Sequence, residues 1–270
     1  MKTLKLLILL SLMLIISACS SDDNLTEDIS YFKGRRYADL DLINEPPEVF
    51  YYNNGKISSV SGFSFFEGDY SYDEKDNLIG KSNFLRNPTV DISYEYDSQK
   101  RLIKEFDNET GNYYQFNYDS NKITVYYFDE ELIAFSQLTV DDNGKIVEFR
   151  DLNNGFFNGF SVEKYVYDNK GNIIEIKWEE NVQGNPDEVS TLLYDQNKNP
   201  YFYTLKDLYK SIYYSECKNG IPSLFHGGFT PNNITKQGLY SYSYEYNDEG
   251  YPIYCINQII DTEYIYDYYE

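Results

Sequence analysis

The stretch Tyr240-Ser-Tyr-Ser-Tyr-Glu-Tyr246, followed by Asn247-Asp-Glu-Gly250, decides the fold of this chain. Tyrosine stands at every second position, and side chains of a β-strand point alternately to opposite faces, so one face is aromatic and the other small and polar. The Asn-Asp-Glu-Gly segment is a tight-turn signal, and a second short strand follows it. The stretch therefore predicts one antiparallel β-hairpin with an aromatic face.

The same pattern recurs along the chain, with Asp, Asn or Gly after most copies. Aspartate and asparagine side chains bond turn amides, and glycine supplies positive φ without a steric penalty. Nine copies align on the residue before the turn, at spacings of 20 to 29 residues: Tyr52, Tyr72, Tyr96, Tyr118, Val140, Tyr167, Tyr194, Cys217 and Tyr246. A period in this range is typical of a repeat architecture.

About nine hairpins give up to about 18 strands, and open twisted sheets rarely exceed about 10 strands without curling. We therefore expect an all-β antiparallel meander over residues 49–270, curled into a barrel-like or coiled sheet. The final Tyr264-Ile-Tyr266-Asp267-Tyr268 is a last strand with no return strand after it. A transmembrane barrel is the structural rival, but the faces without tyrosine carry Ser, Glu, Lys and Asn where an apolar band would be required.

The written pattern, Tyr-x-Tyr-Asp-x-x-Gly-Asn-Ile/Leu-Ile, resembles the YD repeats of RHS-type proteins. It matches best at residues 70–79, 94–103, 165–174 and 244–253, and the resemblance covers most of residues 50–268. The chain is also similar to small Bacteroidetes lipoproteins built from such repeats, which form a porin-like antiparallel meander of unknown function. RHS shells are far longer and end in a toxin domain, so the resemblance does not imply encapsulation.

The N-terminus is typical of a secretory signal peptide over residues 1–18. A basic start precedes an apolar run from Leu6 to Ile16, which is too short to span a bilayer as a helix, since that needs about 20 residues. The closing Ile16-Ser-Ala-Cys19 resembles the lipobox of bacterial lipoproteins, which implies cleavage before Cys19 and lipidation of its thiol. The alternative is an ordinary signal peptide with a chance cysteine.

Residues 19–48 are expected to form the lipidated cysteine, an acidic tether and a lead-in that Pro46-Pro47 ends. Ser21, Asp22 and Asp23 resemble the surface-export signal of Bacteroidetes lipoproteins. That resemblance implies a protein of the outer membrane, anchored to it through lipid and facing the cell exterior. The alternative is that these polar residues are only a solvated tether.

The charge of the mature chain excludes nucleic acid as a partner. Removing residues 1–18 removes Lys2 and Lys5, which leaves 21 basic and 44 acidic side chains and a net charge of −23. Nucleic-acid binding depends on Lys and Arg contacts to phosphates, which such a surface repels. Of the remaining cysteines, Cys217 and Cys255 fall three strands apart in a sequential meander, or about 14 Å, too far for a disulfide, so we expect free thiols.

The sequence gives no sign of an enzyme, a metal site or a cofactor. His226 is the only histidine, and the Gly-x-Ser-x-Gly, Walker and dinucleotide fingerprints are absent. The acidic turns such as Asp141-Asp-Asn-Gly144 invite a calcium hypothesis, but they lack the full ligand spacing of a calcium loop. Turn chemistry explains them.

Tyrosine is the unusual component, with 31 Tyr and 17 Phe beside the single Trp178. These rings are expected to form cross-strand aromatic ladders, with Tyr242 and Tyr244 on the packed face of their strand. The other possibility is that Trp178, Tyr240, Tyr242 and Tyr244 face a ligand such as a sugar ring. The leading hypothesis is a surface lipoprotein with a non-enzymatic structural or binding role. The alternative is a surface component that binds or processes glycans, with a glycan or a cell-surface protein as partner.

The lipobox resemblance generates a first prediction. Replacing Cys19 with alanine removes the thiol that would be acylated, so the protein should leave the membrane fraction. Mass spectrometry of the N-terminus together with fractionation checks this. Continued membrane retention of a Cys19→Ala protein with an unmodified N-terminus would contradict the anchor.

Overall fold

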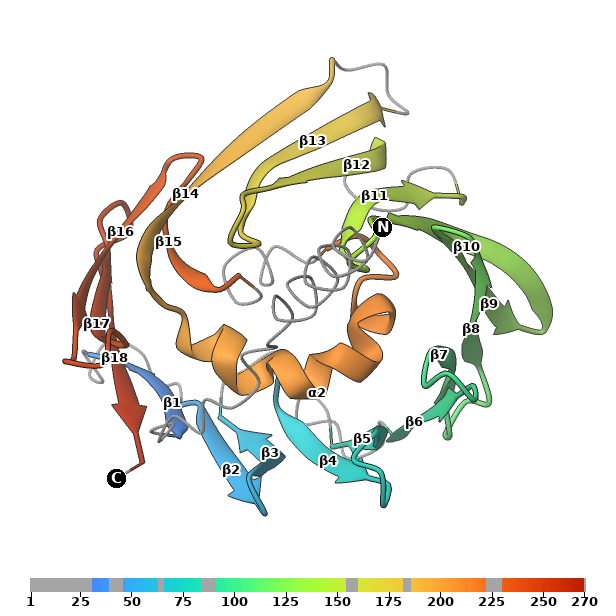
Figure 1. Cartoon of the computed structure of the whole chain (residues 1–270), viewed down its shortest axis with the longest axis horizontal. Coiled ribbons are helices and arrows are strands. Elements are labelled where there is room, and N and C mark those ends of the chain that lie inside the picture. The colour runs from blue at the N-terminus through green and yellow to red at the C-terminus, as the bar shows by residue number, and fades with distance from the viewer. Residues whose placement is uncertain are drawn as a thin grey trace, which may run out of the picture. The chain divides into compact units, whose positions relative to one another are not determined.

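Eighteen antiparallel strands form one sheet that curls into a nearly closed barrel (Figure 1). The structure is a computed structural model that describes residues 31–38, 46–62, 66–83, 91–153, 160–181, 186–221 and 230–269. The strands and the helix all belong to the unit Phe32–Tyr269. Cys19, Ser21, Asp22 and Asp23 lie outside the described residues.

The meander runs from β2 to β18, with each strand paired to the next, and β1 pairs with β18. The strands are β1 (Phe32–Tyr37), β2 (Val49–Asn53), β3 (Lys56–Ser61), β4 (Gly68–Tyr72), β5 (Leu78–Ser82), β6 (Asp91–Tyr96), β7 (Leu102–Asp107), β8 (Tyr113–Asp119), β9 (Lys122–Asp129), β10 (Glu131–Val140), β11 (Ile146–Asp151), β12 (Phe160–Tyr167), β13 (Ile173–Asn181), β14 (Glu188–Lys198), β15 (Asn232–Gln237), β16 (Tyr240–Tyr246), β17 (Pro252–Asn257) and β18 (Thr262–Tyr268). The predicted all-β meander and its curling are confirmed.

Alternation along the strands sends aromatic and aliphatic residues inward. On β16, Tyr242 and Tyr244 are half-buried and pack against the core, whereas Ser243 and Glu245 are exposed. The interior is lined by side chains that solvent does not reach: Phe50, Leu78, Leu102, Phe116, Ile123, Leu138, Ile146, Ile176 and Leu192. The face that the sequence predicts as packed is the inner face.

The repeated tyrosine before each turn has a specific hydrogen-bond partner. Most hairpins carry a β-bulge just after the turn, which leaves one residue outside the ladder, and buried carbonyls beside such a bulge need another donor. The tyrosine of the following repeat donates its hydroxyl to that carbonyl. Seven such bonds, with O···O distances from 2.6 to 2.9 Å, join Tyr52 to Phe32, Tyr72 to Ile57, Tyr96 to Leu78, Tyr118 to Leu102, Tyr167 to Ile146, Tyr194 to Ile173 and Tyr268 to Pro252. All seven acceptors sit at a bulge.

Strand β1 completes the last repeat. Phe32 pairs with Tyr268 and a bulge follows, as in the covalent hairpins, so β1 is the return strand that the chain's final strand lacks. On its other side the Glu48 amide donates to the Arg35 carbonyl at 2.9 Å. A Cβ at Gly34, whose φ is +148°, would lie 1.9 Å from the Glu48 carbonyl oxygen, so only glycine permits this approach. The predicted domain boundary at residue 49 therefore leaves out a strand of the barrel.

Helix α2 (Pro200–Glu216) was not predicted, and it lies inside the ring of strands (Figure 1). Asn199 caps it by accepting from the Tyr201 amide at 3.1 Å, and Pro200 opens its first turn. Leu205, Leu208 and Ile212 are buried against the barrel core. A ring of this many strands is too wide for its own side chains to fill, so the helix supplies the missing apolar volume.

The helix corrects two of the nine predicted hairpins. The copy at Tyr194 runs into α2, so its return strand β15 follows only after the helix, and the degenerate copy at Cys217 is the C-terminal cap of α2. Cys217 and Cys255 are both buried and neither is bonded to another cysteine, but the strand-counting argument is wrong because Cys217 is not on a strand. No helix among the described residues has the length and apolarity to cross a bilayer.

The tyrosine–bulge bonds generate a stability prediction. Tyr96→Phe removes the hydroxyl that satisfies the buried Leu78 carbonyl, so unfolding free energy should fall by about 1–2 kcal/mol. The matched control is Tyr126→Phe on β9, whose hydroxyl has no hydrogen bond among the described residues and which should change stability by less than about 0.5 kcal/mol. Denaturant unfolding compares the two, and equal effects would contradict the role of the bond.

The same tyrosines predict a loss of stability in alkali. Burial raises the pKa of Tyr96 to about 12 from an ordinary 10.0, and burial also raises the pKa of Tyr72 and Tyr167. Below pH 10 both folded and unfolded chains keep these protons, so these tyrosines do not lower the unfolding free energy. Above pH 10 only the unfolded chain releases them, so each such tyrosine should lower unfolding free energy by about 1.4 kcal/mol per pH unit.

Denaturant unfolding between pH 9 and 11.5 measures this slope, and Tyr96→Phe should make it shallower. A slope unchanged by that substitution would show that other groups cause the alkaline loss.

Candidate tyrosine–arginine pocket

A cavity of about 420 Å³ opens on the inner face of the barrel between the start of α2 and the strands β1 and β15 to β18. We call it the tyrosine–arginine pocket, after six of its lining residues: Arg35, Tyr201, Tyr242, Tyr244, Tyr264 and Tyr266. Tyr240, exposed by 46%, also lines it. The volume lies in the range of small-molecule sites, about 300–1,000 Å³.

Strand register explains why these residues meet. Tyr244 pairs with Cys255 on β17, and Cys255 pairs with Tyr264 on β18. Two residues further along β18, Tyr266 pairs with Arg35 on β1. Residues that pair across antiparallel strands share a face, so the alternation of four strands places all five side chains on the inner wall.

Arg35 is the cationic group of the pocket. Its guanidinium lies 4.6 Å from the ring centroid of Tyr264 and 5.5 Å from that of Tyr201, which are cation–π distances. Among the described residues it has no carboxylate within ion-pair distance. The nearby Glu48 is buried and accepts a hydrogen bond from the Tyr201 hydroxyl. A guanidinium carries five N–H donors, so Arg35 keeps donors available for a ligand.

Three tyrosines of the pocket differ in how their hydroxyls are used. Tyr244 donates to the Ile234 carbonyl at 2.9 Å, which fixes its ring as part of the wall. The hydroxyls of Tyr242 and Tyr264 have no hydrogen-bond partner within the described part of the chain. Burial raises the pKa of Tyr242, so its hydroxyl stays protonated near neutrality and can donate. The pocket therefore combines aromatic ring faces with hydroxyl donors that have no hydrogen-bond partner among the described residues.

The structure brings three of the four predicted aromatics together and places the fourth elsewhere. Tyr240, Tyr242 and Tyr244 line the pocket, but Trp178 does not. Trp178 lies on β13 and donates its indole N–H to Glu163 Oε1 at 3.1 Å. Burial is the main cause that raises the pKa of Glu163, against hydrogen bonds from Tyr165 and Trp178 that lower it. Trp178 thus donates a hydrogen bond to a carboxylate of the barrel wall and does not line the pocket.

Sequence reasoning missed Arg35, Tyr201 and the β18 tyrosines as site residues. The alternation of Tyr264-Ile-Tyr266 was a usable signal for an inward aromatic pair. The sequence offered no such signal for Arg35, because residues 19–48 were assigned to a tether and lead-in.

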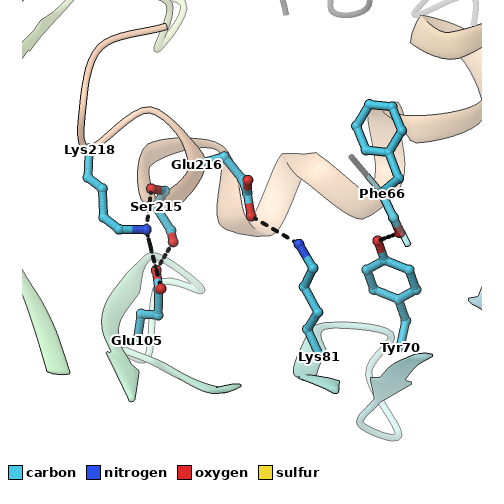
Figure 2. A network of polar contacts seen from close by, with 7 residues as sticks. All are labelled: Phe66, Tyr70, Lys81, Glu105, Ser215, Glu216 and Lys218. Atoms are coloured by element: carbon cyan, nitrogen blue, oxygen red, sulfur yellow. Dashed lines mark hydrogen bonds and ion pairs between the residues drawn. The ribbon is translucent and has the colours of Figure 1, made fainter. Parts of the chain in front are cut away.

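A second polar cluster, shown in Figure 2, fixes the C-terminal end of α2 to the barrel wall. Lys218 Nζ lies 3.1 Å from Glu105 Oε2 on β7, and the Ser215 hydroxyl donates to the same carboxylate. Lys81 on β5 reaches Glu216 at 3.8 Å. Burial lowers the pKa of Lys81, although Glu216 and Glu105 act to raise it. These contacts make α2 a fixed element, so the pocket that it borders has a rigid wall.

The acidic turns are occupied by their own backbone. Asp73 Oδ1 accepts from the amides of Lys75 and Asn77, each at 2.8 Å, and Asp168 accepts from Lys170 and Asn172 in the same way. Within the described ranges no group of three or more His, Cys, Asp or Glu side chains could hold a metal ion. His226 lies outside those ranges.

Comparison with known proteins adds a likeness of fold. No protein-family model matches the chain, and no curated protein matches it. A porin-like protein from Bacteroides vulgatus ATCC 8482 is 11% identical over 88% of this chain and 98% of its own, with a TM-score of 0.42. A porin-like protein from Bacteroides uniformis ATCC 8492 is 13% identical over 88% of this chain and 97% of its own, with a TM-score of 0.35.

Proposed function

We propose that this protein is a non-enzymatic binding protein of the cell surface that takes a saccharide in the tyrosine–arginine pocket. The observation that supports the proposal is a set of inward-facing tyrosine rings around the Arg35 guanidinium, which has N–H donors available for a ligand. Sugar rings present C–H faces that pack on aromatic rings and hydroxyls that need hydrogen-bond partners. The hydroxyls of Tyr242 and Tyr264 and the Arg35 guanidinium supply those partners.

The placement of the protein is part of the same proposal. Cleavage before Cys19 and its lipidation would anchor the chain to the outer membrane, and Ser21, Asp22 and Asp23 would direct it to the exterior. An anchor leaves the barrel in water, which fits the exposed polar residues of the outer face, among them Asp69, Ser71, Glu95, Ser243 and Glu245. A barrel in lipid would need an apolar band there.

A purely structural role is the competing hypothesis, and the pocket residues separate the two. Screening the mature protein against an array of neutral and acidic oligosaccharides should identify at least one ligand. Tyr242→Ala and Arg35→Gln should then weaken its binding at least tenfold. Ser243→Ala, on the outer face of the same strand, is the matched control and should leave affinity unchanged.

Unfolding measured in parallel distinguishes a lost contact from a lost fold. Among the described residues the Tyr242 hydroxyl has no hydrogen bond to the wall, whereas the Tyr244 hydroxyl has one. Tyr242→Ala should therefore cost less stability than Tyr244→Ala, which should cost about 3–5 kcal/mol. No saccharide binding at millimolar ligand, with all variants folded, would favour the structural role.

A further inference from the structure

Two more cavities lie on either side of the middle of α2, apart from the tyrosine–arginine pocket. The first cavity, of about 710 Å³, is bordered by the turns that follow β2, β4 and β6 and by one side of the helix. Four lysines line this cavity, Lys56, Lys75, Lys100 and Lys210, against two carboxylates, Asp76 and Asp207.

The second cavity, of about 530 Å³, lies between α2 and the turns after β10 and β12. It shares Lys210 and Asp207 with the first cavity and adds Lys145, Lys170 and Lys206, with no further acid. Since the two cavities share residues of α2, we treat them as one region and call the seven lysines the lysine mouth.

The lysine mouth reverses the charge balance of the chain. Among the described residues it holds seven lysines and borders two carboxylates, whereas the whole chain has 23 Lys and Arg against 44 Asp and Glu. Only Lys56 among the seven has a carboxylate within ion-pair distance in the described ranges, that of Asp76. Ammonium groups that outnumber the carboxylates around them repel one another, and an anion between them reduces that repulsion.

Solvated turn lysines are the simple explanation, but two different elements deliver these side chains to the same place. Five of them stand in hairpin turns at one end of the barrel, whereas Lys206 and Lys210 are four residues apart on the exposed side of α2. Lys56 and Lys145 also lie over the inner rings of Tyr72 and Tyr167, at 5.2 and 5.0 Å from the centroids. Those two turn lysines therefore point into the barrel.

We propose that the lysine mouth binds a small organic anion that carries two or more phosphate, sulfate or carboxylate groups. Several groups are needed because the ammonium groups come from turns on both sides of the helix. Thr204 on α2 adds a hydroxyl group to the first cavity. The net charge of the whole chain is −21, which disfavours the approach of large polyanions such as nucleic acids, so we expect a small anion.

Calorimetric titration of the mature protein with inorganic tripolyphosphate, citrate and sucrose octasulfate tests the proposal and distinguishes the three anionic groups. At low salt at least one probe should bind with a dissociation constant below about 1 mM, and binding should weaken as salt is added. The triple variant Lys75→Gln, Lys100→Gln, Lys210→Gln should weaken it at least tenfold.

The matched control removes the same charge outside the cavities, as Lys104→Gln, Lys122→Gln, Lys177→Gln, and should change affinity less than twofold. Equal losses in both triple variants would show a general charge effect and overturn the proposal, as would no binding of any probe. The single variant Lys210→Gln, on the exposed side of α2, gives a folded protein in which a partial loss is still measurable. Saccharide binding in the tyrosine–arginine pocket should survive all of these substitutions.

Discussion

The hydrogen bond from a tyrosine hydroxyl to a bulge carbonyl is the constraint on which the barrel depends. The bulge bends each hairpin and raises the local twist that a curled sheet requires, but it leaves a carbonyl without a ladder partner. The tyrosine of the next repeat satisfies that carbonyl from inside the barrel, for example Tyr96 at Leu78 with 2.6 Å. Each repeat thereby stabilises the curvature of its predecessor, which explains why the tyrosine recurs with the turn.

The exceptions follow the same rule. The hairpin of β8 and β9 has no bulge, and the next repeat carries Val140 where the others carry tyrosine. In the repeat that α2 interrupts the bulge lies in β15, and its Ile234 carbonyl accepts from Tyr244 at 2.9 Å, whereas the Tyr246 hydroxyl donates to Asp195. At the described repeat turns a bulge is therefore accompanied by a tyrosine donor, as expected if one creates the need that the other meets.

What the sequence could predict was the part that repeats. Alternation around Tyr242 and the Asp and Gly turn residues determine strands, turns and inner face, because these depend on local chemistry. Strand β1 was not predicted because it is six residues long and its only repeat-like features are Phe32 and Gly34. Their role becomes clear only from the pairing of β1 with β18 beside Tyr268. Helix α2 left weaker signals: the Asn199-Pro200 start, and Leu205, Leu208 and Ile212 at helical spacing. The pocket could not be predicted because Arg35 meets Tyr264 and Tyr266 only when the ring closes.

Closure and the helix together determine where ligands can enter. A ring of 18 strands encloses more space than its own side chains fill, and α2 occupies the middle of that space. The ion pair of Lys218 and Glu105 joins the end of the helix to the wall, and cavities lie beside the helix. Tyr201 at its start faces the ring of tyrosines, whereas Lys210 further along faces the turns and their lysines. One helix therefore provides a wall for two regions of different chemistry, the aromatic tyrosine–arginine pocket with its guanidinium and the two cavities of the lysine mouth with few counter-charges. Both regions share α2 as a wall, so a ligand that shifted the helix would alter both. The polar contacts at the C-terminal end of α2 oppose such a shift, and they therefore help to keep the two regions independent.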